Sequence, residues 1–234
     1  MSFPTKITTI FFDFGDTLVE GNPTYLRRVT ELLGDFGFRR EHCDVVNAFT
    51  KADYLLYRDT QAGSLGDDGE SLMRFLDHFG RCLDIAIDWQ AMLPHILKKF
   101  EEKPFDRVLV QGASKTLETL TKRGYRLGMI SNNDGSCRKK CEAFGIDVHF
   151  EMIIDSAVEE VRKPSPKIFH LALERMGVPA DEAAHVGDMY GSDVMGARDV
   201  GIAPVWYNPS GCDAFADYRP VHEIERLEQM LEIF

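Results

Sequence analysis

The pattern of hydrophobic and polar positions divides the chain into two parts. After about residue 105, short apolar runs alternate with segments whose apolar positions recur at helical spacing. The runs predicted as strands are residues 108–110, 125–130, 152–154, 184–186 and 204–207, and the predicted helices are residues 114–122, 167–176 and 224–234. Repeated strand–helix units predict a parallel sheet with helices on both faces, which is an α/β fold.

The first hundred residues follow a different pattern. The apolar run 10–12 predicts a first strand that stops at Asp13. The segment 21–100 shows helical spacing and few strand patterns. We therefore expect a second, helical module of roughly eighty residues, inserted after the first strand. Its candidate linkers are Gly21-Asn22-Pro23 and Glu101-Glu102-Lys103-Pro104.

Composition limits the possible partners. The chain has 234 residues, 44% of them hydrophobic, and a net charge of −11. An acidic surface repels phosphate backbones and anionic lipids, so we expect no nucleic-acid partner and no membrane partner. A small anionic substrate remains compatible with this charge, because the local charge of a pocket decides its binding.

Cysteine usage and the N-terminal sequence indicate the compartment. The five cysteines are odd in number and scattered, which favours reduced thiols and a cytoplasmic location. Residues 1–6 do not read as a signal peptide, and no apolar run has the length of a transmembrane helix. Cys137 and Cys141 have the spacing of one helix face and are candidates for a shared metal. The lack of a second Cys/His pair favours two free thiols instead.

Polar residues follow several of the predicted strands. Asp13 ends the first strand and is followed by Gly15 and Asp16, which suit a tight turn. In an open α/β sheet, ligands bind at the carboxyl ends of the strands. Asp13 is therefore expected at the floor of a site, held by a rigid strand.

Four such features occur in order along the chain. They are Asp13 to Thr17, Ser131-Asn132, Lys163-Pro164, and Gly187-Asp188 followed by Asp193. This series resembles the haloacid dehalogenase-like hydrolase superfamily, in its branch of phosphatases with a helical cap inserted after the first motif. The resemblance covers nearly the whole chain. It implies a Rossmann-like parallel-sheet core of residues 1–20 and 101–234, and an α-helical cap of residues 21–100.

The resemblance also implies a metal and a nucleophile. Asp13 is the expected nucleophile, which forms an aspartyl-phosphate and also binds Mg²⁺. The backbone carbonyl of Gly15 and the carboxylate of Asp188 are the expected further ligands. Asp193 is expected either as a fourth ligand or as a support behind the ligands.

Four residues are expected at the phosphate. The resemblance implies that Ser131 and the Asn132 amide bind phosphate oxygens, and that Lys163 links the phosphate to the nucleophile by its charge. Thr17 is expected to orient the loop and the phosphate. Each residue also has an ordinary interpretation, such as a helix N-cap for Ser131 or a solvated charge for Lys163. Their order and spacing favour the functional interpretation.

Gly15 departs from the family pattern. Most phosphatases of the superfamily have a second Asp there, which protonates the leaving alcohol and later activates water. Asp16 lies one position further, where a turn residue able to adopt an unusual φ is expected. A contact between Asp16 and the site through a water molecule is the alternative.

The missing acid leaves several functions open. The favoured one is Mg²⁺-dependent hydrolysis of a small phosphorylated metabolite by a monomer or homodimer. A dehalogenase needs no such acid, but it also needs no Mg²⁺ motif. A phosphonatase requires a cap lysine such as Lys51. A catalytically impaired protein that only binds a phosphometabolite is the non-enzymatic alternative.

Overall fold

A six-stranded parallel sheet forms the centre of the molecule. The structure is a computed structural model that describes residues 6–63, 68–102, 105–212, 218–220 and 222–234. The strand order is β5-β4-β1-β6-β7-β8. The strands are β1 (Thr9–Phe12), β4 (Arg126–Ser131), β5 (Met152–Asp155), β6 (Ala183–Gly187), β7 (Ala203–Tyr207) and β8 (His222–Ile224). The predicted α/β fold is confirmed.

Alternation along β1 explains why both faces of the sheet are covered. Ile10 and Phe12 lie in one apolar cluster, whereas Phe11 lies in a second cluster on the opposite face. All three side chains are fully buried. A central strand that is apolar on both faces is typical of a parallel sheet between two helical layers.

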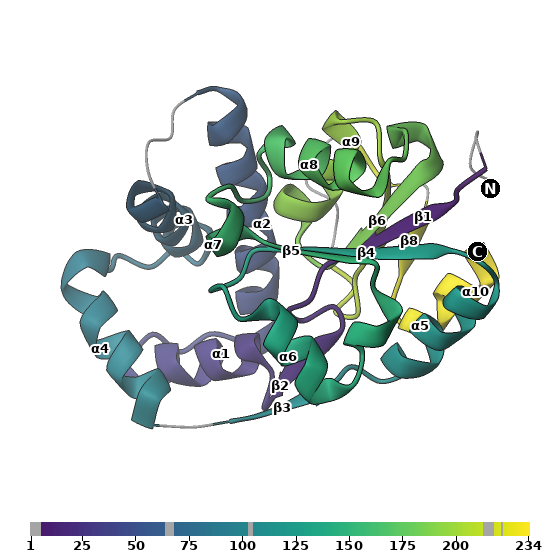
Figure 1. The fold of residues 1–234 in the computed structure, drawn as a ribbon. Helices are drawn as coiled ribbons and strands as arrows, with labels where there is room; N and C mark the ends of the chain where they lie inside the picture. The colour runs from purple at the N-terminus through teal and green to yellow at the C-terminus, as the bar shows by residue number, and fades with distance from the viewer. Residues whose placement is uncertain (1–5, 64–67, 103–104, 213–217, 221) are drawn as a thin grey trace.

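Two helical layers complete this part of the molecule. Figure 1 shows α8 and α9 over one face of the sheet and α5, α6 and α10 over the other. The helices are α5 (Ala113–Lys122), α6 (Cys137–Phe144), α7 (Ser156–Glu159), α8 (Pro166–Met176), α9 (Gly196–Asp199) and α10 (Met230–Ile233), with the single-turn 3₁₀ segments Asp147–His149 and Ala180–Glu182. A π-helical segment, η3 (Tyr190–Met195), follows β6.

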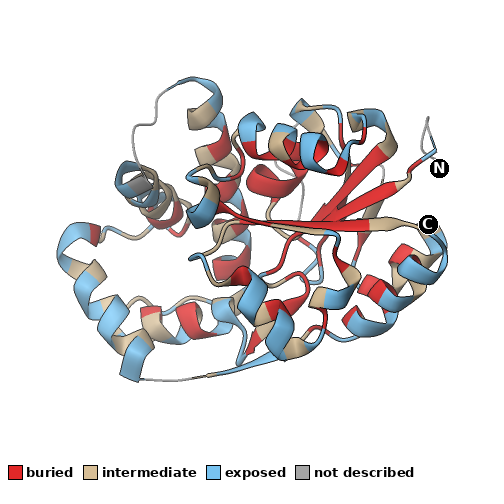
Figure 2. Ribbon diagram, in the orientation of Figure 1, coloured by how far each residue is buried: buried red, intermediate tan, exposed pale blue. Residues whose placement is uncertain are grey.

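Four helices lie between residues 25 and 102. They are α1 (Tyr25–Asp35), α2 (His42–Gln61), α3 (Asp68–Cys82) and α4 (Trp89–Glu102). They share an apolar cluster of their own, built around Val45, Phe79 and Trp89. Their outward faces are largely exposed, while α2 carries buried positions toward the sheet layer (Figure 2). The division of the chain at residues 21 and 100 stays a prediction.

Two predictions about local structure are wrong. Gly21 and Asn22 are not a linker, because β2 (Val19–Asn22) pairs with β3 (Asp106–Leu109) as an antiparallel ribbon. Residues 103 and 104 of the other linker lie outside the described residues. Residues 224–234 do not form one helix either. The side chain of Gln229 accepts hydrogen bonds from the N–H groups of Glu225 and Arg226, and this turn separates Ile224 in β8 from α10.

Among the described residues, no helix combines the length and the apolar character needed to cross a bilayer.

Candidate active site

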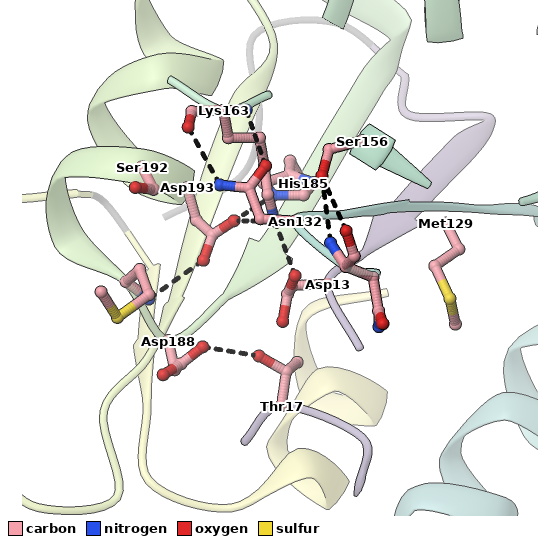
Figure 3. Close-up of polar contacts among 12 residues, drawn as sticks. Asp13, Thr17, Met129, Asn132, Ser156, Lys163, His185, Asp188, Ser192 and Asp193 are labelled. Carbon is pink, nitrogen blue, oxygen red and sulfur yellow. Dashed lines mark hydrogen bonds and ion pairs between the residues drawn. The ribbon is translucent and has the colours of Figure 1, made fainter. Parts of the chain in front are cut away.

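The predicted site residues meet at one edge of the sheet. Asp13 follows β1, Ser131 ends β4, and Asp188 follows β6. Lys163 reaches the same place from the segment between α7 and α8. Figure 3 shows Lys163 turned toward Asp13, and Asp188 turned toward Thr17. The carboxyl ends of adjacent parallel strands are therefore the frame of this site, as expected for an open α/β sheet.

Lys163 lies at the centre of the cluster. Its side chain is only 2% exposed, and its ammonium donates to Asp13 Oδ1 and to Asp193 Oδ1, each at 2.6 Å. Burial by itself lowers the pKa of this lysine, but the charges of Asp13 and Asp193 outweigh burial and raise it above its ordinary value. Lys163 is therefore a permanent cation beside Asp13. The solvated-loop interpretation of Lys163 is wrong.

Asp193 holds Lys163 in place. Its Oδ1 accepts from Lys163 and from His185 Nε2, the latter at 2.9 Å, and its Oδ2 accepts from the Met189 backbone N–H at 3.0 Å. Burial raises the pKa of Asp193, but Lys163 and His185 outweigh burial and bring the pKa down to about 2. Both oxygens already have partners, so the geometry favours a supporting role for Asp193 over direct contact with a metal.

His185 is a member of this site that the sequence did not single out. It lies on β6, is 1% exposed, and packs edge-on against Phe169 with ring centroids 5.4 Å apart. Among the described residues, its Nδ1 has no hydrogen-bond partner. Burial lowers the pKa of His185, so a neutral ring that donates from Nε2 fits this position. A histidine inside a strand predicts only a core side chain, and its partner becomes visible only in three dimensions.

Thr17 and Asp188 form a second pair. The Thr17 hydroxyl donates to Asp188 Oδ1 at 3.2 Å, and Thr17 is fully buried. Burial raises the pKa of Asp188 well above its ordinary value, and the nearby charges of Asp13 and Asp193 raise it further. Burial likewise raises the pKa of Asp13, although Lys163 acts in the opposite direction. Through its hydrogen bond, Thr17 orients the Asp188 carboxylate in this structure.

The charges of the cluster suit a divalent cation. Four carboxyl groups, those of Asp13, Asp16, Asp188 and Asp193, influence one another here. The charge of Lys163 opposes those of Asp13, Asp188 and Asp193. Asp13 and Asp188 offer hard oxygen donors of the type that Mg²⁺ prefers. Within the described residues, no group of three Asp, Glu, His or Cys side chains is arranged as a metal site. A site with two carboxylates, completed by a carbonyl and water, needs no third side chain.

Asn132 has a different place from Ser131. The Asn132 side chain donates from Nδ2 to the Lys163 carbonyl at 2.9 Å and accepts from the Lys163 N–H at 2.8 Å. It therefore clamps the backbone that carries Lys163. Ser131 is 2% exposed at the end of β4, next to this clamp. The phosphate contacts of both residues stay predictions.

Gly15 and Asp16 form the turn after Asp13. Asp16 has a φ of +54°, which confirms the predicted turn conformation, and its N–H donates to the Val19 carbonyl at 2.8 Å. Partial burial and the charge of Asp13 raise the pKa of Asp16 to about 6. A Cβ built on Gly15 meets no atom within 4 Å. Room for a larger side chain therefore exists at the position of the missing acid.

Other candidates from the sequence lie elsewhere. Lys51 is exposed on α2, and its charge influences Cys82, which is a neighbour within the four-helix region. Cys137 and Cys141 are buried free thiols near Met129, which confirms the interpretation as two thiols on one helix face.

Comparison with known proteins places this geometry in a family. Residues 7–201 match the family model of the haloacid dehalogenase-like hydrolases. The glyceraldehyde 3-phosphate phosphatase of Pyrococcus abyssi is 31% identical over 233 residues, which cover 97% of this chain and 93% of that protein. The phosphoserine phosphatase of Thermus thermophilus is 34% identical over 112 residues, 46% of this chain and 45% of that protein.

A solved structure shows the same fold. The chain is similar to a HAD phosphatase from Thermococcus onnurineus with a TM-score of 0.58, 23% identity and 97% coverage of both chains.

Proposed function

Because the chain belongs to the haloacid dehalogenase-like hydrolase family and is a hydrolase, we propose that it is a Mg²⁺-dependent phosphatase of a small phosphorylated metabolite. Phosphatases of this family are generally metal-dependent. Asp13, Asp188 and the Gly15 carbonyl would hold the metal. The observation that carries the proposal is Lys163, a buried cation bonded to Asp13 at 2.6 Å at the carboxyl end of the sheet.

In the first step, an Asp13 carboxylate oxygen attacks the phosphorus of the ester. The new bond from Asp13 to phosphorus forms as the bond to the ester oxygen breaks, and the leaving alcohol takes the electron pair. When bound, Mg²⁺ would supply positive charge that offsets the repulsion between phosphate and carboxylates. Lys163 donates to the carboxylate throughout and stabilises the charge that develops on the phosphoryl oxygens.

In the second step, water attacks the phosphorus of the aspartyl-phosphate. The bond from Asp13 to phosphorus breaks, inorganic phosphate leaves, and the Asp13 carboxylate is regenerated. Both steps move a proton, first to the leaving oxygen and then from the attacking water. Glycine at position 15 has no acidic side chain, so solvent water gives the proton to the leaving oxygen, and esters with a good leaving group suit the site best.

The relatives suggest which substrates to test first. A glyceraldehyde 3-phosphate phosphatase is similar over nearly the whole chain, and a phosphoserine phosphatase over about half of it. Both names denote small phosphate esters. None of the five cysteines, all of which lie in the described residues, forms a disulfide bond, which supports a reducing, cytoplasmic location as part of the proposal.

The test is a phosphatase panel with and without Mg²⁺, containing p-nitrophenyl phosphate, glyceraldehyde 3-phosphate and phosphoserine. We expect turnover that requires Mg²⁺. Calorimetry should show Mg²⁺ binding that Asp188→Ala removes, because half of the carboxylate ligands are lost. Asp181→Ala is the matched control, since Asp181 is exposed on the surface.

Three results would contradict the proposal. Turnover that is unaffected by Asp188→Ala would remove the metal assignment. Phosphate binding without turnover of any ester would favour the binding protein. Release of phosphate from a phosphonate but not from esters would favour a phosphonatase.

A further inference from the structure

Helix α2 contacts η3, the segment that follows Asp188 in the chain, directly through Asp53. This side chain comes from the four-helix region, yet it is 2% exposed and lies against η3. One carboxylate oxygen, Oδ2, accepts from the N–H groups of Gly191 and of Ser192, the latter at 3.0 Å. The other oxygen, Oδ1, accepts from the Ser192 hydroxyl at 2.5 Å. Asp53 therefore satisfies backbone donors at the start of η3, as a capping residue does.

The fit between α2 and η3 is close. A Cβ on Gly191 would lie 2.4 Å from the Asp53 carbonyl oxygen, so only glycine allows this approach. An apolar cluster surrounds the contact and includes Val46 and Tyr57 from α2 and Tyr190 and Val194 from η3. Apolar packing therefore holds α2 beside η3, while the hydrogen bonds of Asp53 fix the position of residues 191–192.

The segment that Asp53 holds carries the chemistry of the site. Gly191 and Ser192 lie between Asp188 and Asp193 in the chain. Asp193 bonds Lys163, and Lys163 bonds Asp13. A shift of the backbone at residues 191–192 would move both carboxylates, and with them the lysine.

We propose that Asp53 is a positioning residue for the reaction, which fixes the segment 188–193 from the helical region and so aims Asp188 and Asp193. The proposal rests on the proposed function for its reaction, but the contact itself is independent of it. The helical region thereby contributes to the assembly of the metal and lysine site, in addition to any contact that it makes with the substrate.

The chemistry of Asp53 gives two informative variants. Asp53→Asn keeps a carbonyl oxygen for the two backbone N–H groups and places an amide donor opposite the Ser192 hydroxyl. Asp53→Ala removes every acceptor and leaves buried N–H groups without partners. The control is Tyr57→Phe, which removes the hydrogen bonds of the Tyr57 hydroxyl to Asp199 and Arg198 but keeps the ring in the apolar cluster.

The experiment combines amide hydrogen exchange with kinetics and Mg²⁺ calorimetry. In Asp53→Ala we expect faster exchange at residues 191–192, and a loss of about 10–100-fold in Mg²⁺ affinity and in kcat on p-nitrophenyl phosphate, the range for outer partners of a metal site. KM should change little. Asp53→Asn should restore most of each quantity, and Tyr57→Phe should leave all of them near wild type.

Several results would overturn this proposal. Unchanged exchange at residues 191–192 in Asp53→Ala would mean that the contact is not made in solution. Faster exchange with wild-type Mg²⁺ affinity would mean that Asp53 has a purely structural role. If the wild type turns over no ester, the proposed function fails, and the Mg²⁺ affinity of Asp53→Ala still decides this proposal.

Discussion

At the scale of single residues, His185 determines how Asp193 meets Lys163. The imidazole lies behind the site, out of reach of a substrate, and donates to the same Asp193 oxygen that Lys163 uses. A neutral donor at this place keeps Asp193 ionised without adding a second positive charge beside Lys163. The position of the lysine therefore depends on a residue that touches no reacting atom.

Replacement of His185 tests this dependence. His185→Leu removes the donor, and we expect kcat to fall about 10–100-fold with little change in KM, as for other outer partners of catalytic groups. His185→Gln restores an N–H donor and should recover much of the rate. Phe169→Leu is the control for packing, because Phe169 contacts the ring but makes no hydrogen bond to Asp193. Equal losses in all three variants would contradict a positioning role.

Under the proposed function, we expect Gly15 to determine which esters the site hydrolyses. We expect aryl esters such as p-nitrophenyl phosphate to be turned over much faster than alkyl esters, because a phenolate leaves with little protonation. Gly15→Asp should raise the alkyl rate selectively, by up to about 10²–10⁴-fold if the acid is restored in full. The variant is sterically possible, since a Cβ at this position meets nothing within 4 Å.

Equal wild-type rates on the two classes of ester would show that an acid is already present. Asp16→Asn would then test whether the carboxyl next to Gly15 supplies it. A normal alkyl rate in Asp16→Asn would exclude Asp16.

The residues of this site differ in how far sequence predicts them. Asp13, Lys163 and Asp188 follow strands or precede a helix at fixed places in the fold, and the structure brings them together. Asn132 and Asp193 are at the expected place, but their hydrogen-bond partners are set by side-chain geometry that spacing does not contain. His185 and Asp53 carry no sequence signal. Asp53 acts through a contact with residues far away in the chain, and His185 acts on nearby Asp193 through side-chain geometry that the hydrophobic pattern does not contain.

At the scale of elements, the contact between α2 and η3 makes stability depend on pH. Burial raises the pKa of Asp53 to about 6, although the bonds from Ser192 act in the opposite direction. A carboxyl whose pKa is higher in the folded state binds more protons there. Its contribution to the free energy of unfolding is therefore largest at low pH and is lost as the pH rises through about 6.

Asp53→Asn removes this titration. Relative to the variant, the wild type should lose about 2 kcal/mol of unfolding free energy between about pH 4 and about pH 7, which is most of the linkage expected for a shift from 3.8 to about 6. Urea denaturation of both proteins across this range measures the difference. A difference that stays constant with pH would contradict the raised pKa.

The elements themselves follow the hydrophobic pattern where a strand or helix is long and buried. Residues 167–176 were predicted as a helix, and α8 spans Pro166–Met176. The predicted strand 108–110 overlaps β3, but β2 and the antiparallel pairing of the two were missed. The four-residue strands pair across more than eighty residues of intervening chain, and β2 has little periodicity of its own. The end of the chain was misassigned because a Gln229 side chain, rather than a Gly or Pro, makes the turn after β8.

At the scale of the whole molecule, the net negative charge affects how an anionic substrate approaches the site. The chain carries a net charge of −11, and the carboxyl groups of Asp13, Asp16 and Asp188, which are part of this total, lie together at the site. An anionic ester approaching such a site is repelled unless cations are present. Under the proposed function, Lys163 and a bound metal supply this positive charge in the same place.

The proposed function requires that Asp13 becomes covalently phosphorylated, and the phosphorylated protein can be trapped. The protein is mixed with p-nitrophenyl phosphate and Mg²⁺, quenched in acid within the first turnovers, digested and examined by mass spectrometry. The account predicts a phosphoryl group on the peptide that contains Asp13, and its absence in Asp13→Asn, which should fold normally but have no turnover because an amide is not a nucleophile. Turnover by Asp13→Asn at a rate comparable to the wild type, or a phosphoryl group on another residue, would contradict it.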